Sequence, residues 1–417
     1  MTNEETVIAI FALMHKLRNT KRKGWYDENI KRYRVESVGD HIYSTQMLAY
    51  AMQSEFNYNV DIRKVILMLA VHEIGETVIG DLTPEDMQED LKSQYESKTV
   101  KSLLDLIPDS ELLRNLFTEF ETRETKEAKF AYQIDKAECD LQARLYEQEG
   151  AFIENYPKYS FTKKWIEFDR KRISFDKNFS SLLDFVMNND MTICSHSENK
   201  IQNVISFYTL TNSLKDVQRT GEILWKIHPE HYGSIAEHIY STETLALAIY
   251  LIYSPNIDIT EVINMLATHE LGEIVIGDKS ALLKSKSDRD NEWQGALKIA
   301  NFLSNGKDII DRLSSFNEGK TPEATYCKYC DKLAPDIISK IYDQLNLIDL
   351  TKQEGNPLLN NPIVKKHLEA GKSFSEMWIL YGQEAYNYPE PFISISNYAL
   401  NNEVTEPFTR ELKLKQK

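Results

Sequence analysis

The chain has 417 residues, 42% of them hydrophobic and 27% charged, and it carries a formal net charge of −15. This length allows two or three domains with substantial cores, and the composition is that of a globular chain rather than a disordered one. The acidic balance argues against a nucleic-acid polymer as the main partner, because phosphate backbones are bound by clustered Lys and Arg.

The first segment, residues 1–17, combines an acidic start with a short apolar run, unlike the basic start of a secretory signal peptide. No run of 18 apolar residues occurs, so we expect no membrane span and no membrane partner. Four cysteines are too few for a disulfide framework. Together these features predict a cytoplasmic protein.

A basic stretch follows at residues 16–34. Such a local group of cations could bind a small phosphate-bearing molecule even in an acidic chain, and a solvated loop is the alternative interpretation. Its members are Lys16, Arg18, Lys21, Arg22, Lys23, Lys31, Arg32 and Arg34.

Helices are predicted throughout the chain. It has only 15 Gly and 12 Pro, and hairpin turns between alternating strands are scarce. Residues 62–79 have the apolar spacing of one helix face, and Pro335 predicts a kink or a helix start after Asp331. The expected fold class is therefore all-α. The apolar positions of that face are Ile62, Val65, Ile66, Leu69 and Ala70.

Two stretches far apart in the chain are nearly identical. Residues 67–81 (LMLAVHEIGETVIGD) and residues 264–278 (NMLATHELGEIVIGD) agree at 11 of 15 positions. Upstream, residues 40–51 agree with residues 237–248 at 8 of 12 positions, with the same offset of 197 residues. A fixed offset of this kind indicates an internal duplication.

The duplication predicts two tandem domains, residues 1–195 and residues 198–395. The polar stretch at residues 188–200 is the expected junction between them. Residues 396–417 lose helical periodicity, so we expect a poorly ordered tail there.

The duplicated segments repeat a set of polar residues inside apolar helices, which a hydrophobic core does not require. A His from one helix, an adjacent His and Glu from a second and an Asp from a third would bring N and O donors together in a helical bundle. Such mixed donors predict a divalent-metal site, one metal ion per repeat. The predicted ligands are His41, His72, Glu73 and Asp135 in the first copy, and His238, His269, Glu270 and Asp331 in the second.

The repeated histidines and carboxylates have two alternative interpretations. A single histidine on an apolar helix is more often a core residue, but matched histidines and carboxylates in two copies favour the metal site. A zincin site needs a second His four residues after the first, and positions 76 and 273 are Glu. The zincin interpretation is therefore excluded.

The order of these motifs resembles the HD-domain metal-dependent phosphohydrolases, and more closely the branch that contains the 5′-deoxynucleotidases. Members of that branch read like ESVAEH, HDxxExxxGD and DKxE. The first copy has ESVGDH, HEIGETVIGD and DKAE, and the second has GSIAEH, HELGEIVIGD and DKLA in the same order. The resemblance covers both halves and implies two all-helical HD domains, expected to be related by a pseudo-twofold axis as an intramolecular pseudo-dimer.

The resemblance also implies an activity, the hydrolysis of a phosphate monoester in a nucleotide-like small molecule by a metal-activated water. Glu76 and Asp81, with Glu273 and Asp278 in the second copy, would act beyond the metal ligands. They would orient or deprotonate the water, assist proton transfer or hold the sugar.

Substrate contacts are expected upstream of the first His of each copy. Trp25 resembles the aromatic residue that the family carries there, and Trp225 is its predicted counterpart. Trp25 precedes His41 by 16 residues and Trp225 precedes His238 by 13, which predicts a surface loop of unequal length near each site. The predicted substrate-binding residues are Arg18, Lys23, Trp25, Trp225 and Lys226.

Two departures from the family pattern bear on the metal. Glu replaces the usual Asp after the second His in both copies, and one more methylene moves the carboxylate by about 1.5 Å. Ala334 stands where the first copy has Glu138. Dinuclear HD sites carry extra histidines, and residues 82–134 and 279–330 contain none, which favours one metal ion per repeat.

The sequence does not distinguish Mn, Co, Fe, Ni, Zn or Mg as that ion. Two alternative functions stay open at this point. One is a nucleoside triphosphate hydrolase, and the other is a nucleotide-binding regulatory protein in which one or both sites are inactive.

Overall fold

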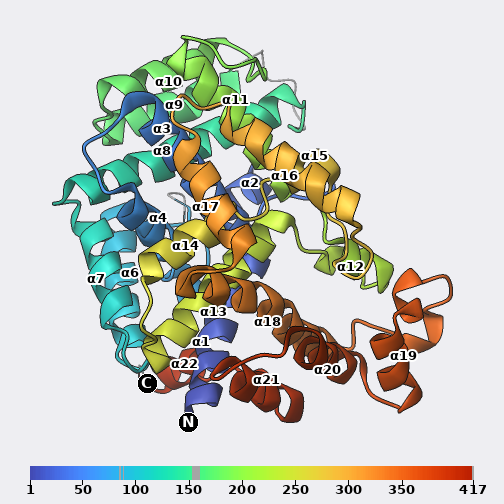
Figure 1. Cartoon of the computed structure of the whole chain (residues 1–417). Helices are drawn as coiled ribbons and strands as arrows, with labels where there is room; N and C mark the ends of the chain where they lie inside the picture. Colours follow the sequence, from blue (N-terminus) through green and yellow to red (C-terminus); the bar gives the residue numbers. More distant parts are fainter. Residues whose placement is uncertain (84–85, 88, 153–159, 416–417) are drawn as a thin grey trace.

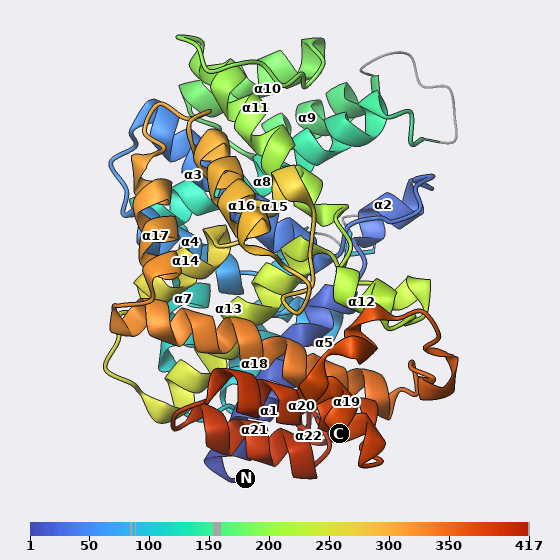
Figure 2. The ribbon, with the colours of Figure 1, turned by 45° about the vertical axis from the view of Figure 1, so that its right-hand side comes forward.

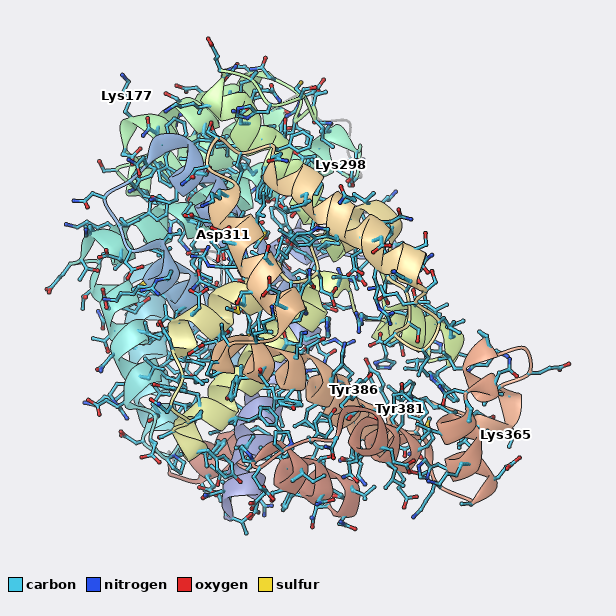
Figure 3. All side chains as sticks on the ribbon, in the orientation of Figure 1. Lys177, Lys298, Asp311, Lys365, Tyr381 and Tyr386 are labelled. Carbon is cyan, nitrogen blue, oxygen red and sulfur yellow. The ribbon has the colours of Figure 1, made fainter. Side chains whose placement is uncertain are left out.

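The computed structural model describes residues 1–83, 86–87, 89–152 and 160–415. Helices make up most of the described part of the chain, and the β-structure in it is limited to two isolated β-bridges, Lys21 with Ser37 and Gln218 with Ser234. The predicted all-α class is confirmed (Figure 1). Charged side chains such as Lys177, Lys298 and Lys365 lie on the exposed outer faces of the helices (Figure 3).

In the described residues of the first repeat there are ten α-helices. They are α1 (Asn3–Asn19), α2 (Lys23–Asp27), α3 (Val38–Phe56), α4 (Ile62–Val71), α5 (Glu76–Ile79), α6 (Glu89–Leu104), α7 (Glu111–Thr122), α8 (Lys126–Gln148), α9 (Ser160–Arg172) and α10 (Lys177–Asn188).

The rest of the chain forms the second repeat and a C-terminal helix. The helices are α11 (Lys200–Asn212), α12 (Thr220–Leu224), α13 (Ile235–Tyr253), α14 (Ile259–Thr268), α15 (Glu273–Ile276), α16 (Lys286–Ala300), α17 (Lys307–Glu318), α18 (Pro322–Gln344), α19 (Pro362–Glu369), α20 (Phe374–Tyr386), α21 (Phe392–Asn401) and α22 (Phe408–Lys415), with 3₁₀ turns η1 (Ser213–Lys215), η2 (Pro229–His231), η3 (Leu350–Lys352) and η4 (Pro357–Asn360).

The helices that carry the duplicated motifs start at matched capping residues. Ser37 and Ser234 cap α3 and α13 through capping boxes, in which the serine hydroxyl and a carboxylate three residues on satisfy the first backbone N–H groups. Asp61 and Asp258 cap α4 and α14 with their side-chain carboxylates, which accept hydrogen bonds from backbone N–H groups of the first turn. Local sequence therefore fixes the starts of equivalent helices in both repeats.

The two repeats interlock through their first helices. α1, at the start of the first repeat, packs against α13 of the second, and α11, at the start of the second repeat, packs against α3 of the first (Figures 1 and 2). α3 and α13 also pack on each other at the centre of the molecule. One hydrophobic core extends through both repeats as a result.

A hydrogen bond between equivalent residues marks this centre. Gln46 on α3 donates to the Glu243 carboxylate on α13 at 3.1 Å, and the two positions are 197 residues apart. Equivalent residues of two copies meet at a pseudo-twofold axis, so the contact supports the expected intramolecular pseudo-dimer.

The repeats differ in the connection after their longest helix. Residues 149–159 connect α8 to α9, whereas residues 345–373 connect α18 to α20 and contain α19, η3 and η4. This insertion shifts the end of the second repeat, so the predicted boundary at residue 395 falls inside α21.

The expectation of a poorly ordered tail after residue 396 was wrong. The tail includes α22, which packs against α1 and α6 of the first repeat and buries Phe408 and Leu412. Lys16 on α1 binds Glu406 and Thr409. A helix of eight residues, about two turns, is too short to give a clear periodic signal, which is why the sequence pattern missed α22. Pro335 lies inside α18 and neither starts nor ends it.

Candidate metal centres

The first set of predicted ligands converges from three parts of the first repeat. His41 lies on α3, His72 and Glu73 follow the end of α4, and Asp135 lies on α8. His41 Nε2 is 3.1 Å from Asp135 Oδ1 and 3.7 Å from Glu73 Oε1. His72 Nε2 is 3.6 Å from Glu73 Oε1 and 3.8 Å from Asp135 Oδ1. One donor atom from each residue therefore fits within a cluster 4.8 Å across.

The second set has nearly the same geometry. His238 Nε2 is 3.1 Å from Asp331 Oδ1 and 3.4 Å from Glu270 Oε1. His269 Nε2 is 3.5 Å from Glu270 Oε1 and 3.7 Å from Asp331 Oδ1. Two sequences that diverged elsewhere thus keep one arrangement of four donors.

The helix predicted over residues 62–79 is broken at the ligands. α4 ends at Val71, residues 72–75 form turns, and α5 starts at Glu76, with the same break after α14 in the second repeat. In the turns, backbone N–H groups bond to carbonyls three residues back instead of four, as from Glu76 to Glu73. Periodicity of apolar residues does not detect such a local tightening, so the continuous helix was predicted wrongly.

The break orients the two histidines that follow α4 and α14. His72 Nδ1 lies 2.7 Å from the Leu69 carbonyl and His269 Nδ1 lies 2.7 Å from the Leu266 carbonyl. A hydrogen bond there places the ring proton on Nδ1 and leaves Nε2 as a lone-pair donor. Both Nε2 atoms are buried and have no hydrogen-bond partner among the described residues.

This donor set fits a divalent cation. Donor atoms about 2.1 Å from one tetrahedral ion are about 3.4 Å from each other, close to the distances seen here. Buried imidazole nitrogens without a hydrogen-bond partner, beside two carboxylates, are the chemistry of such a site. The longer Glu73 and Glu270 side chains reach their clusters from the turn.

Charges in the first cluster influence one another strongly. Burial and Arg22 lower the pKa of His41, but Glu138 and Asp135 outweigh them and raise it to about 9. Burial would raise the pKa of Asp135, but Lys136 and the two histidines hold it well below the usual range. The cluster therefore favours positive charge at its centre, carried by protons or by a cation.

Glu76 and Glu273 are the first residues of α5 and α15 and lie buried beside the clusters. Burial, with Glu270 and Asp278, raises the pKa of Glu273 well above its usual range. Lys284 lies 3.3 Å from Glu273 and 2.7 Å from Glu292. A carboxylate in such surroundings readily accepts a proton.

Asp81 and Asp278, which follow α5 and α15, bind the starts of α2 and α12. The Asp81 carboxylate accepts a hydrogen bond from the backbone N–H of Lys23 at 2.6 Å, and Asp278 accepts one from Thr220 at 2.5 Å. These contacts hold the starts of α2 and α12 beside the clusters. Lys23 itself points outward, and its ammonium group pairs with Asp27 and Asp86.

One pair of arginines was not among the predicted substrate-binding residues, although Arg22 belongs to the basic stretch. Arg22 and Arg219 immediately precede α2 and α12 and are 197 residues apart. Arg22 Nη1 is 3.7 Å from Glu73 Oε1, and Arg219 Nη1 is 3.5 Å from Asp278 Oδ1. The matched offset, which identified the ligands, was the signal that could have identified these two cations as well.

Arg18 lies away from the cluster of its own repeat. It is buried, donates to Glu222 at 2.9 Å and lies 3.6 Å from Glu237, both in the second repeat. Its guanidinium also lies over the Tyr342 ring. Arg18 therefore joins the two repeats, and its predicted contact with substrate is not supported by this position.

The predicted equivalence of Trp25 and Trp225 is wrong. α2 and α12 are offset by 197 residues, which aligns Trp25 with Glu222 and leaves no difference in loop length. Trp25 donates to Glu36 at 2.6 Å, whereas Trp225 packs on Phe374 and Trp378.

Trp225 and Lys226 hold the insertion of the second repeat. The Trp225 carbonyl accepts from Gln353, and the Lys226 ammonium donates to the carbonyls of Lys352 and Glu354. Their contacts are structural, and the expected substrate role of this pair is not supported by them.

Comparison with known proteins agrees with this geometry. The HD domain family matches two segments of the chain, residues 14–171 and residues 211–359, which together contain every predicted ligand. The chain belongs to the HD-domain family. Each matched segment contains one four-residue cluster, so the chain is a tandem HD protein.

Several known proteins are similar to a part of this chain. The 5′-deoxynucleotidase HDDC2 of Bos taurus is 32% identical over 154 residues, 36% of this chain and 71% of that protein. The HDDC2 protein of Dictyostelium discoideum is 30% identical over 156 residues, 36% of this chain and 81% of that protein. A solved structure of a conserved hypothetical protein from Pyrococcus furiosus is 23% identical, with a TM-score of 0.36, and the match covers 43% of this chain and 98% of that one.

Proposed function

We propose that this tandem HD protein is a metal-dependent phosphohydrolase that releases phosphate from nucleoside 5′-monophosphates, with deoxynucleotides as the first substrates to test. The observation that carries the proposal is the pair of buried four-residue clusters with histidine nitrogens free to bind a cation. The sequence similarity of about a third of this chain to proteins named 5′-deoxynucleotidases supports the choice of substrate.

In this proposal one divalent cation binds per repeat. His41, His72, Glu73 and Asp135 hold the first and His238, His269, Glu270 and Asp331 the second. Such an ion supplies Lewis-acid polarisation of a phosphoryl oxygen and lowers the pKa of a nearby water. Mn, Co, Fe, Ni, Zn and Mg are all compatible with mixed N and O donors.

The protein's own residues do the remaining work. Glu76 and Glu273 accept the proton of the attacking water as its oxygen forms the new P–O bond. The P–O5′ bond breaks, and the same carboxyl group returns the proton to O5′, which leaves as the hydroxyl of the nucleoside. Asp81 and Asp278 hold α2 and α12 so that Arg22 and Arg219 face the phosphate. The guanidinium groups offset the negative charge of the phosphate and of its transition state.

The arginines of the basic stretch that pair elsewhere in the protein do not favour the triphosphate alternative. Arg18, Arg32 and Arg34 are each paired with carboxylates of the protein. A triphosphate would need several uncommitted cations, so a monophosphate is the better match.

The location and assembly of the protein belong to the same proposal. All four cysteines are free, as in proteins of reducing compartments, and we infer a cytoplasmic enzyme. None of the described helices is long and apolar enough to span a membrane. The interlocked repeats take the place of a homodimer, so a monomeric chain is expected to be active.

A phosphate-release assay over nucleoside mono- and triphosphates tests the function. The chain loaded with Mn²⁺ should release phosphate from deoxynucleoside 5′-monophosphates, and the double variant His72→Ala with His269→Ala should release none. Unchanged release by the double variant would refute the hydrolase. Each single variant measures the share of its own repeat and tests the alternative of one inactive site.

A further inference from the structure

A carboxylate lies directly behind one ligand of the first cluster. Glu138 Oε2 is 2.6 Å from His41 Nδ1, on the side of the ring opposite to the cluster. Carboxylates in this position fix the orientation and tautomer of a ligating histidine and make it a stronger donor. Glu138 and His41 are both fully buried, so this contact is shielded from water.

Besides His41, three donors hold Glu138, and the second repeat provides two of them. Ser44, from the first repeat, donates to Glu138 Oε1 at 2.5 Å. Tyr208 on α11 donates to the same oxygen at 2.7 Å, and Lys215 on η1 donates to it at 3.0 Å. The packing of α11 on α3 thus brings a buried cation of the second repeat behind the first metal centre.

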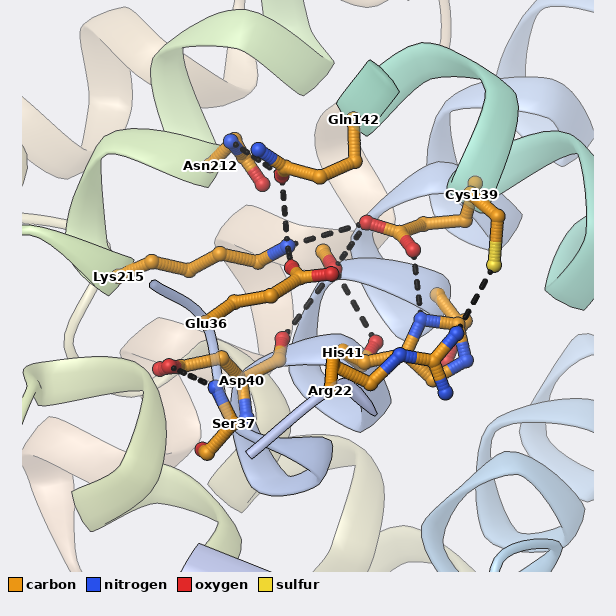
Figure 4. Close-up of polar contacts among 12 residues, drawn as sticks. Arg22, Glu36, Ser37, Asp40, His41, Cys139, Gln142, Asn212 and Lys215 are labelled. Carbon is orange, nitrogen blue, oxygen red and sulfur yellow. Dashed lines mark hydrogen bonds and ion pairs between the residues drawn. The ribbon is translucent and has the colours of Figure 1, made fainter. Parts of the chain in front are cut away.

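Lys215 also binds a second acid of the first repeat. Its ammonium group donates to Glu36 Oε2 at 2.5 Å and to Gln142 at 3.0 Å (Figure 4). The Glu36 and Glu138 carboxylates and the Lys215 ammonium together carry a net negative charge. This charge lies on the Nδ1 side of His41, opposite the Nε2 atom that would bind the metal ion, and it favours a cation there. Without Lys215, Glu36 and Glu138 would repel each other in a buried space.

The second repeat lacks the equivalent network. The positions that match Glu36 and Glu138 are Gly233 and Ala334. Arg18, which matches Lys215, fills the space beside Gly233, where an added Cβ would lie 2.0 Å from its Nη2 atom. Nδ1 of His238 forms no hydrogen bond with another described residue, in contrast to Nδ1 of His41.

We propose that Lys215 is a positioning residue for the first metal centre, acting from the second repeat through Glu138 on His41. The inference rests on the metal sites of the proposed function. It makes the two centres unequal, with the first one completed only when the second repeat is docked. The second centre depends on no matching contact from the first repeat.

Mn²⁺ binding without nucleotide tests this inference in chains that keep one centre. His269→Ala leaves the first centre and His72→Ala leaves the second, and equilibrium dialysis gives the dissociation constant of each. Lys215→Met should raise the dissociation constant of the first centre by about tenfold or more, which is the usual effect of losing a group that orients a ligand. The same substitution should leave the second centre within about twofold of its value.

The second centre is the matched control, because misfolding would weaken both. If Lys215→Met fails to fold, Tyr208→Phe is the second variant, because it removes only the hydroxyl that donates to Glu138. Tyr208→Phe should weaken Mn²⁺ binding at the first centre alone, by a smaller factor than Lys215→Met. Equal effects on both centres, or none on the first from either variant, would overturn the inference. Mn²⁺ binding is independent of hydrolysis, so inactivity towards nucleotides would refute the proposed function and leave this result standing.

Discussion

At the scale of single residues, the geometry of each centre depends on the residue after its second histidine. Glu73 and Glu270 extend from turns rather than from continuous helices, and their carboxylates lie 3.6 and 3.5 Å from His72 and His269. The methylene group by which Glu exceeds Asp therefore lets each carboxylate reach its cluster from the turn.

Glu73→Asp tests this interpretation. Shortening the side chain withdraws the carboxylate by about 1.5 Å, so we expect Mn²⁺ to bind the first centre about tenfold or more weakly, as when a ligand is misplaced. Glu270→Asp should have the same effect at the second centre. Tighter binding by the aspartate variants would show that the glutamates do not reach the ion.

Arg22 gives a second prediction at this scale, because its guanidinium faces the first cluster. In the His269→Ala chain, Arg22→Ala should lower kcat/KM for a deoxynucleoside monophosphate about 10- to 100-fold, the effect of losing a hydrogen bond to a charged group. Lys31→Ala removes an exposed cation of the same basic stretch and serves as the control. An equal loss in both variants would mean that only overall charge matters.

At the scale of elements, the turns between α4 and α5 and between α14 and α15 are held by close packing of a glycine. An added Cβ at Gly272 would lie 2.4 Å from the backbone oxygen of Glu292 on α16. At Gly75 it would lie 2.5 Å from Oε1 of the Glu96 side chain. A side chain can rotate away, whereas a helix backbone has to shift.

We therefore expect Gly→Ala to lower the free energy of unfolding by different amounts at Gly272 and at Gly75. Gly272→Ala should lower the free energy of unfolding by about 1–3 kcal/mol, as overpacking does, and Gly75→Ala should lower it by less. Chemical denaturation of the two variants measures the difference. A larger loss at Gly75 would contradict the packing described here.

The crossing of α3 and α13 contains a buried acid with pH-dependent consequences. Burial raises the pKa of Glu243 well above its usual range, and Gln46 is its hydrogen-bond partner. The unfolded chain ionises this group from about pH 4.3, while the folded chain keeps it protonated. The free energy of unfolding therefore falls as the pH rises from there towards the raised pKa.

Glu243→Gln removes this dependence and keeps the hydrogen bond to Gln46. We expect the variant to be more stable than the wild type at pH 8, by about 1 kcal/mol or more, and the difference to shrink towards pH 4.5. Denaturation curves at several pH values measure it. A variant less stable than the wild type at pH 8 would show that Glu243 is ionised in the folded chain.

At the scale of the whole molecule, the duplication organises both the fold and the sites. The scarcity of Gly and Pro and the helical spacing of apolar residues predicted the all-helical fold. The repeated His, Glu and Asp residues predicted the two donor clusters, because matched polar residues at a constant offset are visible in one sequence. The interlocking of α1 and α11 was not predictable, since a helix's apolar face does not reveal which repeat it covers. Trp225 was misassigned because residue type was followed instead of the offset.

The insertion at residues 345–373 and the helix α22 show the same limit at larger scale. Trp225 and Lys226 bind this insertion, and Lys16 binds the segment before α22. These contacts join residues far apart in the chain, so local sequence patterns cannot predict them. Residues whose roles depend on such contacts were assigned to substrate or to a loop by type alone.

The central claim is that each repeat binds one divalent cation through its cluster. The most direct measurement is the Mn²⁺ content of the purified chain and its variants by elemental analysis after equilibrium dialysis. The account predicts two ions per chain in the wild type, one in His72→Ala, one in His269→Ala and none in the double variant. Two ions retained by the double variant would contradict it.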